Sequence, residues 1–129
     1  MTEQNETDPA MAPTQVRPES ETREERVRRL NDELRKGTSC DGSIVFTSGI
    51  QAGGLEFVSE VMKAVAAFDS FDEDNDPWNE HDFGALDVRD ERVFFKIDYY
   101  DRELTGHSPD KSDPAVTKRV LTIMLASEY

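Results

Sequence analysis

The residues Glu80, His81 and Asp82 form the densest group of potentially catalytic side chains in this 129-residue chain. Histidine exchanges protons near neutral pH, and histidine together with carboxylates is a common ligand set for transition metals. If the three residues begin a β-strand, Glu80 and Asp82 point to one face and His81 to the other. A metal site would then need a further ligand, for instance Asp98 or Asp101 on the neighbouring strand. The opposing interpretation is structural: His81 is a hydrogen-bonded corner residue that orients the turn through Asp76 or Asp82.

One functional hypothesis is therefore a small metal-dependent hydrolase or nuclease. Lys96 would stabilise developing negative charge in such a site. Lys96 and Asp98 share a strand face, however, and could pair across to Asp82 as an ordinary cross-strand ion pair. They could equally form a buried polar site, since lysine and aspartate rarely lie among aromatic residues without a reason. The candidate catalytic residues are His81, Asp82, Lys96 and Asp98, and the candidate metal ligands are Asp76, Glu80, His81 and Asp82. A divalent cation is the one ligand this hypothesis needs, and no other cofactor is predicted.

The segment 69–82 is rich in carboxylates and contains no lysine or arginine. An EF-hand loop that started at Asp72 would need glycine at its sixth position and glutamate at its twelfth. Pro77 and Phe83 occupy those positions, which excludes an EF-hand, and a solvated acidic loop is the simpler interpretation. The second functional hypothesis is a non-enzymatic interaction protein that binds a basic protein partner through this surface. We expect the surface to comprise Asp69, Asp72, Glu73, Asp74, Asp76 and Trp78.

Two other motifs lack the residues that their chemistry requires. The glycines of segment 49–54 have the spacing of a phosphate-binding loop, but Leu55 and Glu56 follow where lysine and serine or threonine are needed. Cys40 is the single cysteine, which rules out an intrachain disulfide. A Cys–His nucleophile would require one of the two histidines to lie beside Cys40, and a lone loop thiol is the simpler interpretation.

The composition limits the choice of partner. The formal net charge is −13, from 28 acidic and 15 basic residues. Nucleic-acid binding normally requires a basic surface that neutralises phosphates, so direct binding to DNA, RNA or an anionic membrane is not expected. The first six residues lack the basic start and apolar run of a signal peptide, and no apolar stretch approaches the ~18 residues of a membrane helix. We therefore expect a cytoplasmic protein.

The elements that position these residues follow from local patterns. Residues 1–20 contain three prolines among polar side chains and predict a disordered tail, which leaves 21–129 as a single α+β domain. Thr22 and Glu25 form a capping box that begins a helix, whose apolar stripe is Val27, Leu30 and Leu34. The helix is expected to end at Gly37.

Further along the chain, strand and helix signals alternate. We predict a strand at 44–47, a helix at 55–68 with Leu55, Val58, Val61, Met62, Val65 and Phe68 on its core face, and a hairpin with arms at 83–88 and 92–100. Asp113 and Pro114 are typical of a helix start, which predicts a last helix that buries Val116, Val120, Ile123 and Met124. The expected fold is a small, mostly antiparallel three-stranded sheet with about three packed helices.

Several long motifs are similar to those of a known family. They are LNDELR (30–35), TSGI (47–50), NDPWNEHDFG (75–84), KIDYYD (96–101) and TKRVLTIMLASEY (117–129). Together they resemble the bacterial domain family of unknown function DUF3768 over about 24–129, with Phe95 standing where that family usually has tryptophan. The resemblance implies no catalytic residue. It does imply a small bacterial accessory protein, often encoded on plasmids and other mobile DNA near antirestriction-type genes.

Overall fold

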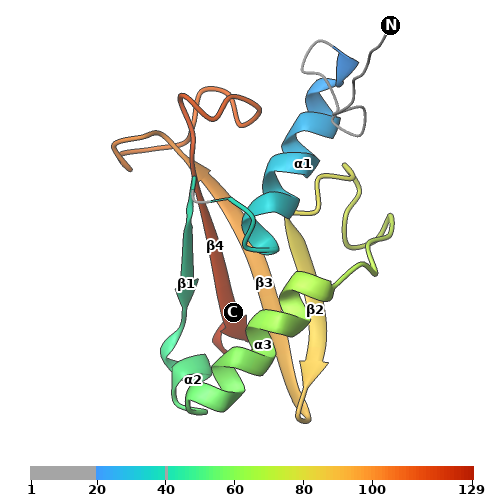
Figure 1. The fold of residues 1–129 in the computed structure, drawn as a ribbon, viewed down its shortest axis with the longest axis vertical. Helices are drawn as coiled ribbons and strands as arrows, with labels where there is room; N and C mark the ends of the chain where they lie inside the picture. Colours follow the sequence, from blue (N-terminus) through green and yellow to red (C-terminus); the bar gives the residue numbers. More distant parts are fainter. Residues whose placement is uncertain (1–19, 40) are drawn as a thin grey trace, which may run out of the picture.

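The computed structural model describes residues 20–39 and 41–129 (Figure 1). Its helices are α1 (Arg23–Arg35), α2 (Ser48–Gln51), α3 (Leu55–Ala67) and the 3-10 helix η3 (Ala126–Glu128); its strands are β1 (Ser43–Phe46), β2 (Phe83–Val88), β3 (Glu91–Tyr100) and β4 (Lys118–Leu125). The α+β class is confirmed. None of the described helices is long and apolar enough to cross a membrane. The predicted tail at 1–20 lies, apart from Ser20, outside the described residues, as does Cys40, and the single domain at 21–129 stays a prediction.

The four strands form one mixed sheet in the order β1-β4-β3-β2. β3 is antiparallel to both of its neighbours, whereas β1 runs parallel to β4. A parallel pair needs a long crossover connection, which α2, α3 and the β2–β3 hairpin supply here. The prediction of a three-stranded, mostly antiparallel sheet was therefore wrong in strand number. The additional strand is β4, which pairs in parallel with β1.

The predicted last helix is in fact β4, the strand in the sheet between β1 and β3. Arg119, Leu121 and Ile123 alternate with less buried residues along the strand, which is the two-residue period of a strand. Asp113 caps only a turn, in which its side chain accepts a hydrogen bond from the Ala115 N–H. The spacing of the apolar residues fitted a helix locally, but pairing with two neighbouring strands decides the structure.

Helix α1 begins where the capping box predicts. The Thr22 hydroxyl accepts the Glu25 N–H at 3.0 Å, and the Glu25 carboxylate accepts the Thr22 N–H at 3.0 Å. The helix ends at Arg35, and Gly37 follows with a positive φ of 78°. The hairpin is also confirmed: β2 and β3 are joined by Arg89 and Asp90, both with positive φ, as tight hairpin turns require.

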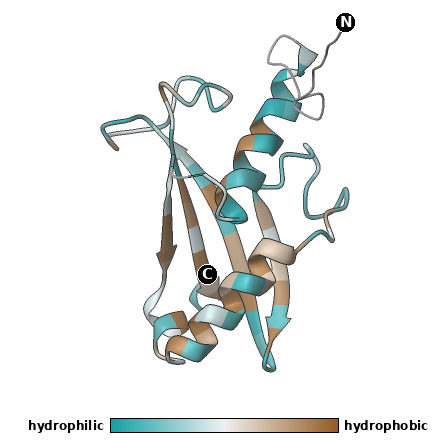
Figure 2. Ribbon diagram, in the orientation of Figure 1, coloured by the Kyte–Doolittle hydropathy of each residue, from teal (hydrophilic) through white to brown (hydrophobic). Residues whose placement is uncertain are grey.

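The hydrophobic core lies between the helices and one face of the sheet, called here the inner face (Figure 2). Phe57, Val61 and Val65 form the buried stripe of α3 and pack against Phe95 and other inner-face residues. The observed core face of α3 is therefore rotated about the helix axis relative to the predicted one: Val58 and Met62 are only partly buried, and Leu55 is 89% exposed. The core residues are Leu34, Ile50, Phe57, Val61, Val65, Val88, Val93, Phe95, Ile97, Leu121 and Ile123.

Candidate functional site

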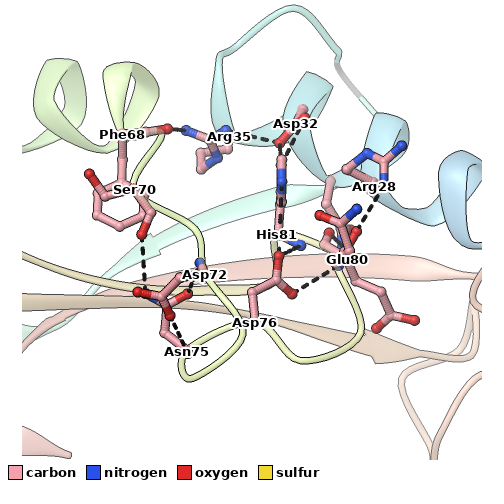
Figure 3. A network of polar contacts seen from close by, with 12 residues as sticks. Arg28, Asp32, Arg35, Phe68, Ser70, Asp72, Asn75, Asp76, Glu80 and His81 are labelled. Carbon is pink, nitrogen blue, oxygen red and sulfur yellow. Dashed lines mark hydrogen bonds and ion pairs between the residues drawn. The ribbon is translucent and has the colours of Figure 1, made fainter.

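The turn before β2 is organised by the buried carboxylate of Asp76. Its two oxygens accept the backbone N–H groups of Glu80 at 2.9 Å and of His81 at 3.1 Å (Figure 3). Asn79 and His81 both have positive φ, 57° and 60°, so this segment is a folded corner and β2 begins only at Phe83. The alternation of side chains expected for a strand at 80–82 therefore does not apply.

The His81 side chain is held between two aspartates. Its Nδ1 lies 2.9 Å from an oxygen of Asp32 on α1, and its Nε2 lies 3.9 Å from Asp76. The ring stacks on Phe71 with 3.8 Å between centroids and 6° between planes. With both ring nitrogens facing carboxylates and one ring face covered, His81 serves as a link between the corner and α1.

Asp32 also bonds Arg35, which is 1% exposed. Its Nη2 lies 2.9 Å from Asp32, and its Nη1 donates to the carbonyls of Val65 at 2.7 Å, Ala66 at 3.2 Å and Phe68 at 2.9 Å. These carbonyls are at the C-terminal end of α3, where helices leave acceptors without intrahelical partners. Arg35 therefore caps α3 from α1.

Asn31, one turn before Arg35, is a fully buried hub. Its side-chain amide donates to the Glu80 carbonyl at 3.0 Å and to the Tyr99 hydroxyl at 2.7 Å. Its oxygen accepts from Arg119 Nε of β4 at 3.0 Å. Asn31 thus connects α1, the corner, β3 and β4 with one side chain.

The charged groups around Asn31 have hydrogen-bond partners inside the protein, but only some of these partners are oppositely charged. The Glu80 carboxylate is almost fully buried and accepts from Lys111 Nζ at 2.8 Å. Arg119 also donates to the Lys111 carbonyl. Burial lowers the pKa of Arg119, and burial together with the Asp82 charge raises the pKa of Tyr99. This centre is a closed network in which most polar groups bond other protein groups.

The Asp82 carboxyl in this network also has a shifted pKa. Burial first, and then the Glu80 and Asp76 charges, raise the pKa of Asp82 above its ordinary value. Its folded-state pKa thus exceeds its unfolded-state pKa. Its stabilising contribution is fully present below the unfolded-state pKa and is lost as pH rises through the folded-state pKa.

We therefore expect Asp82→Asn to be more stable than the wild type at neutral pH, because the amide stays uncharged. The measurement is urea denaturation of both proteins across a pH series from acid to neutral, where their difference should grow with pH. Asp87→Asn, which removes an exposed carboxylate from β2, is the matched control and should not reproduce that growth. A constant difference between Asp82→Asn and the wild type would contradict the assignment.

The structure divides the four candidate catalytic residues between two faces of the sheet. Asp82 lies beside the Tyr99 hydroxyl, at 3.4 Å, on the side of the helices, near His81. Lys96 and Asp98 point to the opposite, outer face and pair with each other at 3.0 Å. The suggested cross-strand ion pair with Asp82 was therefore wrong, because Lys96 pairs with Asp98 instead. Within residues 20–39 and 41–129, no three histidine, cysteine, aspartate or glutamate side chains are grouped so as to hold a metal.

Sequence reasoning missed the polar residues on which the network depends. Asn31 and Arg35 follow Val27 at four-residue steps, so they lie on the buried face of α1. That spacing was the available signal, since polar residues on an apolar stripe are unusual. Their partners Glu80 and Arg119 are distant in the chain, which local patterns do not reveal. The missed residues are Asn31, Asp32, Arg35, Tyr99 and Arg119.

The predicted interaction surface is largely exposed. Of its six residues only Asp76 is buried, and Trp78 is 75% exposed. The loop has its own hydrogen bonds: Asp72 accepts the N–H groups of Asp74 and Asn75, and Asn75 donates to the Ser70 carbonyl. We call residues 69–79 the acidic loop. A hollow of about 300 Å³ in it is lined by Phe71, Asp72, Glu73, Asp76, Pro77 and Asn79.

A family model described as "Protein of unknown function (DUF3768)" matches residues 46–128. The chain belongs to this family. The searches of curated proteins and of solved structures gave no match. The segment matched by DUF3768 contains the acidic loop, the corner, Tyr99 and Arg119, whereas Asn31, Asp32 and Arg35 of α1 lie before it. Helix α1 thus completes the polar network of the matched DUF3768 segment from outside it.

Proposed function

We propose that the protein is a non-enzymatic interaction protein whose acidic loop binds a basic protein partner. The observation that carries the proposal is Trp78, an indole ring 75% exposed on a loop without lysine or arginine. Tryptophan is among the residues that dominate binding energy at protein interfaces. An aromatic face also attracts the guanidinium or ammonium group of a basic partner.

The carboxylates around Trp78 supply the complementary charge. Asp69, Glu73 and Asp74 are exposed, and the backbone that presents them is fixed by the Asp72 and Asn75 hydrogen bonds. A loop that is ordered before binding loses less conformational entropy on association. The net charge of −13 would also speed the encounter with a basic protein.

The alternative hydrolase or nuclease has less support from the geometry. Its candidate groups lie on opposite faces of the sheet, and His81 is already held between Asp32 and Asp76. The interaction proposal needs no such convergence, because it requires only an exposed surface. The resemblance to plasmid-encoded accessory proteins supports a cytoplasmic partner that handles DNA, whose phosphate-binding surface the loop would occupy.

Trp78 is the only tryptophan, so its fluorescence reports directly on the acidic loop. We expect an arginine-rich peptide to change this fluorescence saturably and a neutral peptide of equal length to leave it unchanged. The apparent affinity should fall steeply with added salt, since exposed charges are screened. Asp69→Asn, Glu73→Gln and Asp74→Asn together should weaken binding at least about tenfold, which corresponds to ~1.4 kcal/mol.

The matched control removes three exposed carboxylates elsewhere, by Glu24→Gln, Glu56→Gln and Glu91→Gln. It changes the net charge equally but should retain most of the binding. Equal weakening by both triple variants would show that net charge alone attracts the peptide, and the acidic loop would no longer be assigned as the binding site.

A further inference from the structure

Strand β1 is an edge strand whose free side is uncharged. Within the described sheet it pairs only with β4, and it carries apolar side chains on both faces: Ile44 and Phe46 on the inner face and Val45, 44% exposed, on the outer face. No charged residue occurs from Gly42 to Leu55, although a third of the chain is charged. Edge strands are normally protected from pairing with another chain by shortness, charged residues or proline, and of these β1 has only its four-residue length.

The free edge adjoins an apolar groove. The groove has a volume of about 500 Å³ and is lined by Ile44 and Phe46 of β1 and by Leu55, Val58 and Met62 of α3. Among the described residues that line it, Lys63 is the only charged one. Figure 2 shows the continuous hydrophobic stretch of β1 at the edge of the sheet. An exposed edge and an exposed apolar face thus occur together.

The hydrogen-bond pattern of β1 fixes which backbone groups point outward. Thr47 N–H donates to the Ile123 carbonyl of β4, so Val45, two residues earlier, also directs its backbone groups to β4. Ile44 and Phe46 therefore direct theirs to the free side. The Phe46 carbonyl confirms this orientation, because it accepts a hydrogen bond from the exposed Gln51 side chain at 2.7 Å.

We propose that a second copy of this chain pairs with β1, antiparallel about a two-fold axis at Val45. In this register Ile44 of each copy exchanges backbone hydrogen bonds with Phe46 of the other copy. The Phe46 carbonyl already accepts a hydrogen bond from Gln51, and its second lone pair would accept the Ile44 N–H of the other copy. The two Val45 residues form a non-hydrogen-bonded pair, with Cα atoms about 4.5 Å apart. The two sheets become one continuous sheet.

A second copy fits this edge because the strand is complementary to itself. Two chains that each carry −13 repel one another, and an uncharged contact adds least to that repulsion. Segment 42–55 is the longest stretch of the chain without charge. Val45 meets Val45 on the outer face, while Ile44 and Phe46 of both copies meet beside the two grooves on the inner face. Such an isologous contact closes at two copies and does not propagate.

The oligomeric state of the full chain tests the proposal. Sedimentation equilibrium over a wide concentration range should show a monomer–dimer equilibrium that shifts to dimer with added salt, because salt screens the repulsion. Binding of a basic partner by the acidic loop should respond to salt in the opposite direction. Val45→Lys should be monomeric at every concentration with an unchanged circular dichroism spectrum, and Val45→Thr should remain dimeric.

Cross-linking tests the register independently of whether Val45→Lys folds. In a Cys40→Ser background, Val45→Cys should form a disulfide-linked dimer on mild oxidation, because the paired side chains adjoin. Asp87→Cys, on the opposite edge strand β2, is the control and should remain unlinked. A wild type that is monomeric throughout, or a dimer that Val45→Lys leaves intact and Val45→Cys does not link, would overturn the proposal. So would binding of a foreign strand to β1 by a monomer.

Discussion

Arg35→Leu is expected to lower the free energy of unfolding by about 3 kcal/mol, because the buried guanidinium bonds carbonyls at the end of α3 as well as the partly exposed Asp32. The leucine would leave the Phe68 carbonyl without its Arg35 donor, the Val65 carbonyl with only the Phe68 N–H, and Asp32 without the guanidinium. It would also remove the guanidinium that lies 5.3 Å from the Phe71 ring centroid. Urea denaturation followed by circular dichroism measures the change.

Two variants separate the charge from its fork geometry. Arg35→Lys keeps a cation but has a single nitrogen, so it should recover only part of the lost stability. Arg92→Leu removes an arginine from an exposed ion pair with Asp87 and should cost less than about 1 kcal/mol. If Arg35→Leu cost no more than Arg92→Leu, Arg35 would not be the cap of α3 described above.

Asn31→Leu is expected to cost about 3 kcal/mol or more. Leucine has a similar volume, so the loss would come from the groups that Asn31 bonds: the Glu80 carbonyl, the Tyr99 hydroxyl and the Arg119 guanidinium. Each buried group left without a partner costs about 1–3 kcal/mol. Denaturation in urea gives the value, and α1 should show the largest increase in amide hydrogen exchange because it loses its link to β3 and β4.

Tyr99→Phe is the matched control, since it removes one of the three partners and leaves the other two. It should cost about 1 kcal/mol. The double variant should lose less than the sum of the two single variants, because both remove the same 2.7 Å hydrogen bond. Strict additivity would mean that this bond contributes nothing to stability.

Helices and strands whose signals lie within a few consecutive residues were predicted correctly. The capping box located α1, and the alternation of Val93, Phe95 and Ile97 located β3 and its buried face. Strand β4 was misassigned because Val116, Val120 and Ile123 fit a helical repeat, and its pairing with β1 joins residues far apart in the chain, such as Ser43 and Val120. Such pairing depends on tertiary contacts, which outweigh local preference.

The candidate site was predicted only in part, because some of its contacts join residues that are far apart in the chain. Asp76 and His81 were noticed because of their residue types, and the structure has the predicted hydrogen bond between them, from the His81 N–H to the Asp76 carboxylate. The link from His81 to Asp32 spans 49 positions and has no local signature. The positive φ of His81 also invalidated the strand geometry from which side-chain directions were inferred.

The position of β4 in the sheet has a consequence for synthesis of the chain. Residues 118–125 form the strand between β1 and β3, so both of these strands leave the ribosome before the strand they flank. Until β4 emerges, β1 has no neighbouring strand to pair with, although it belongs to the uncharged segment 42–55. Exposed apolar surface and unpaired strand edges make incompletely folded chains prone to aggregate. Nascent chains interrupted before residue 118 should therefore depend on chaperones that bind apolar segments.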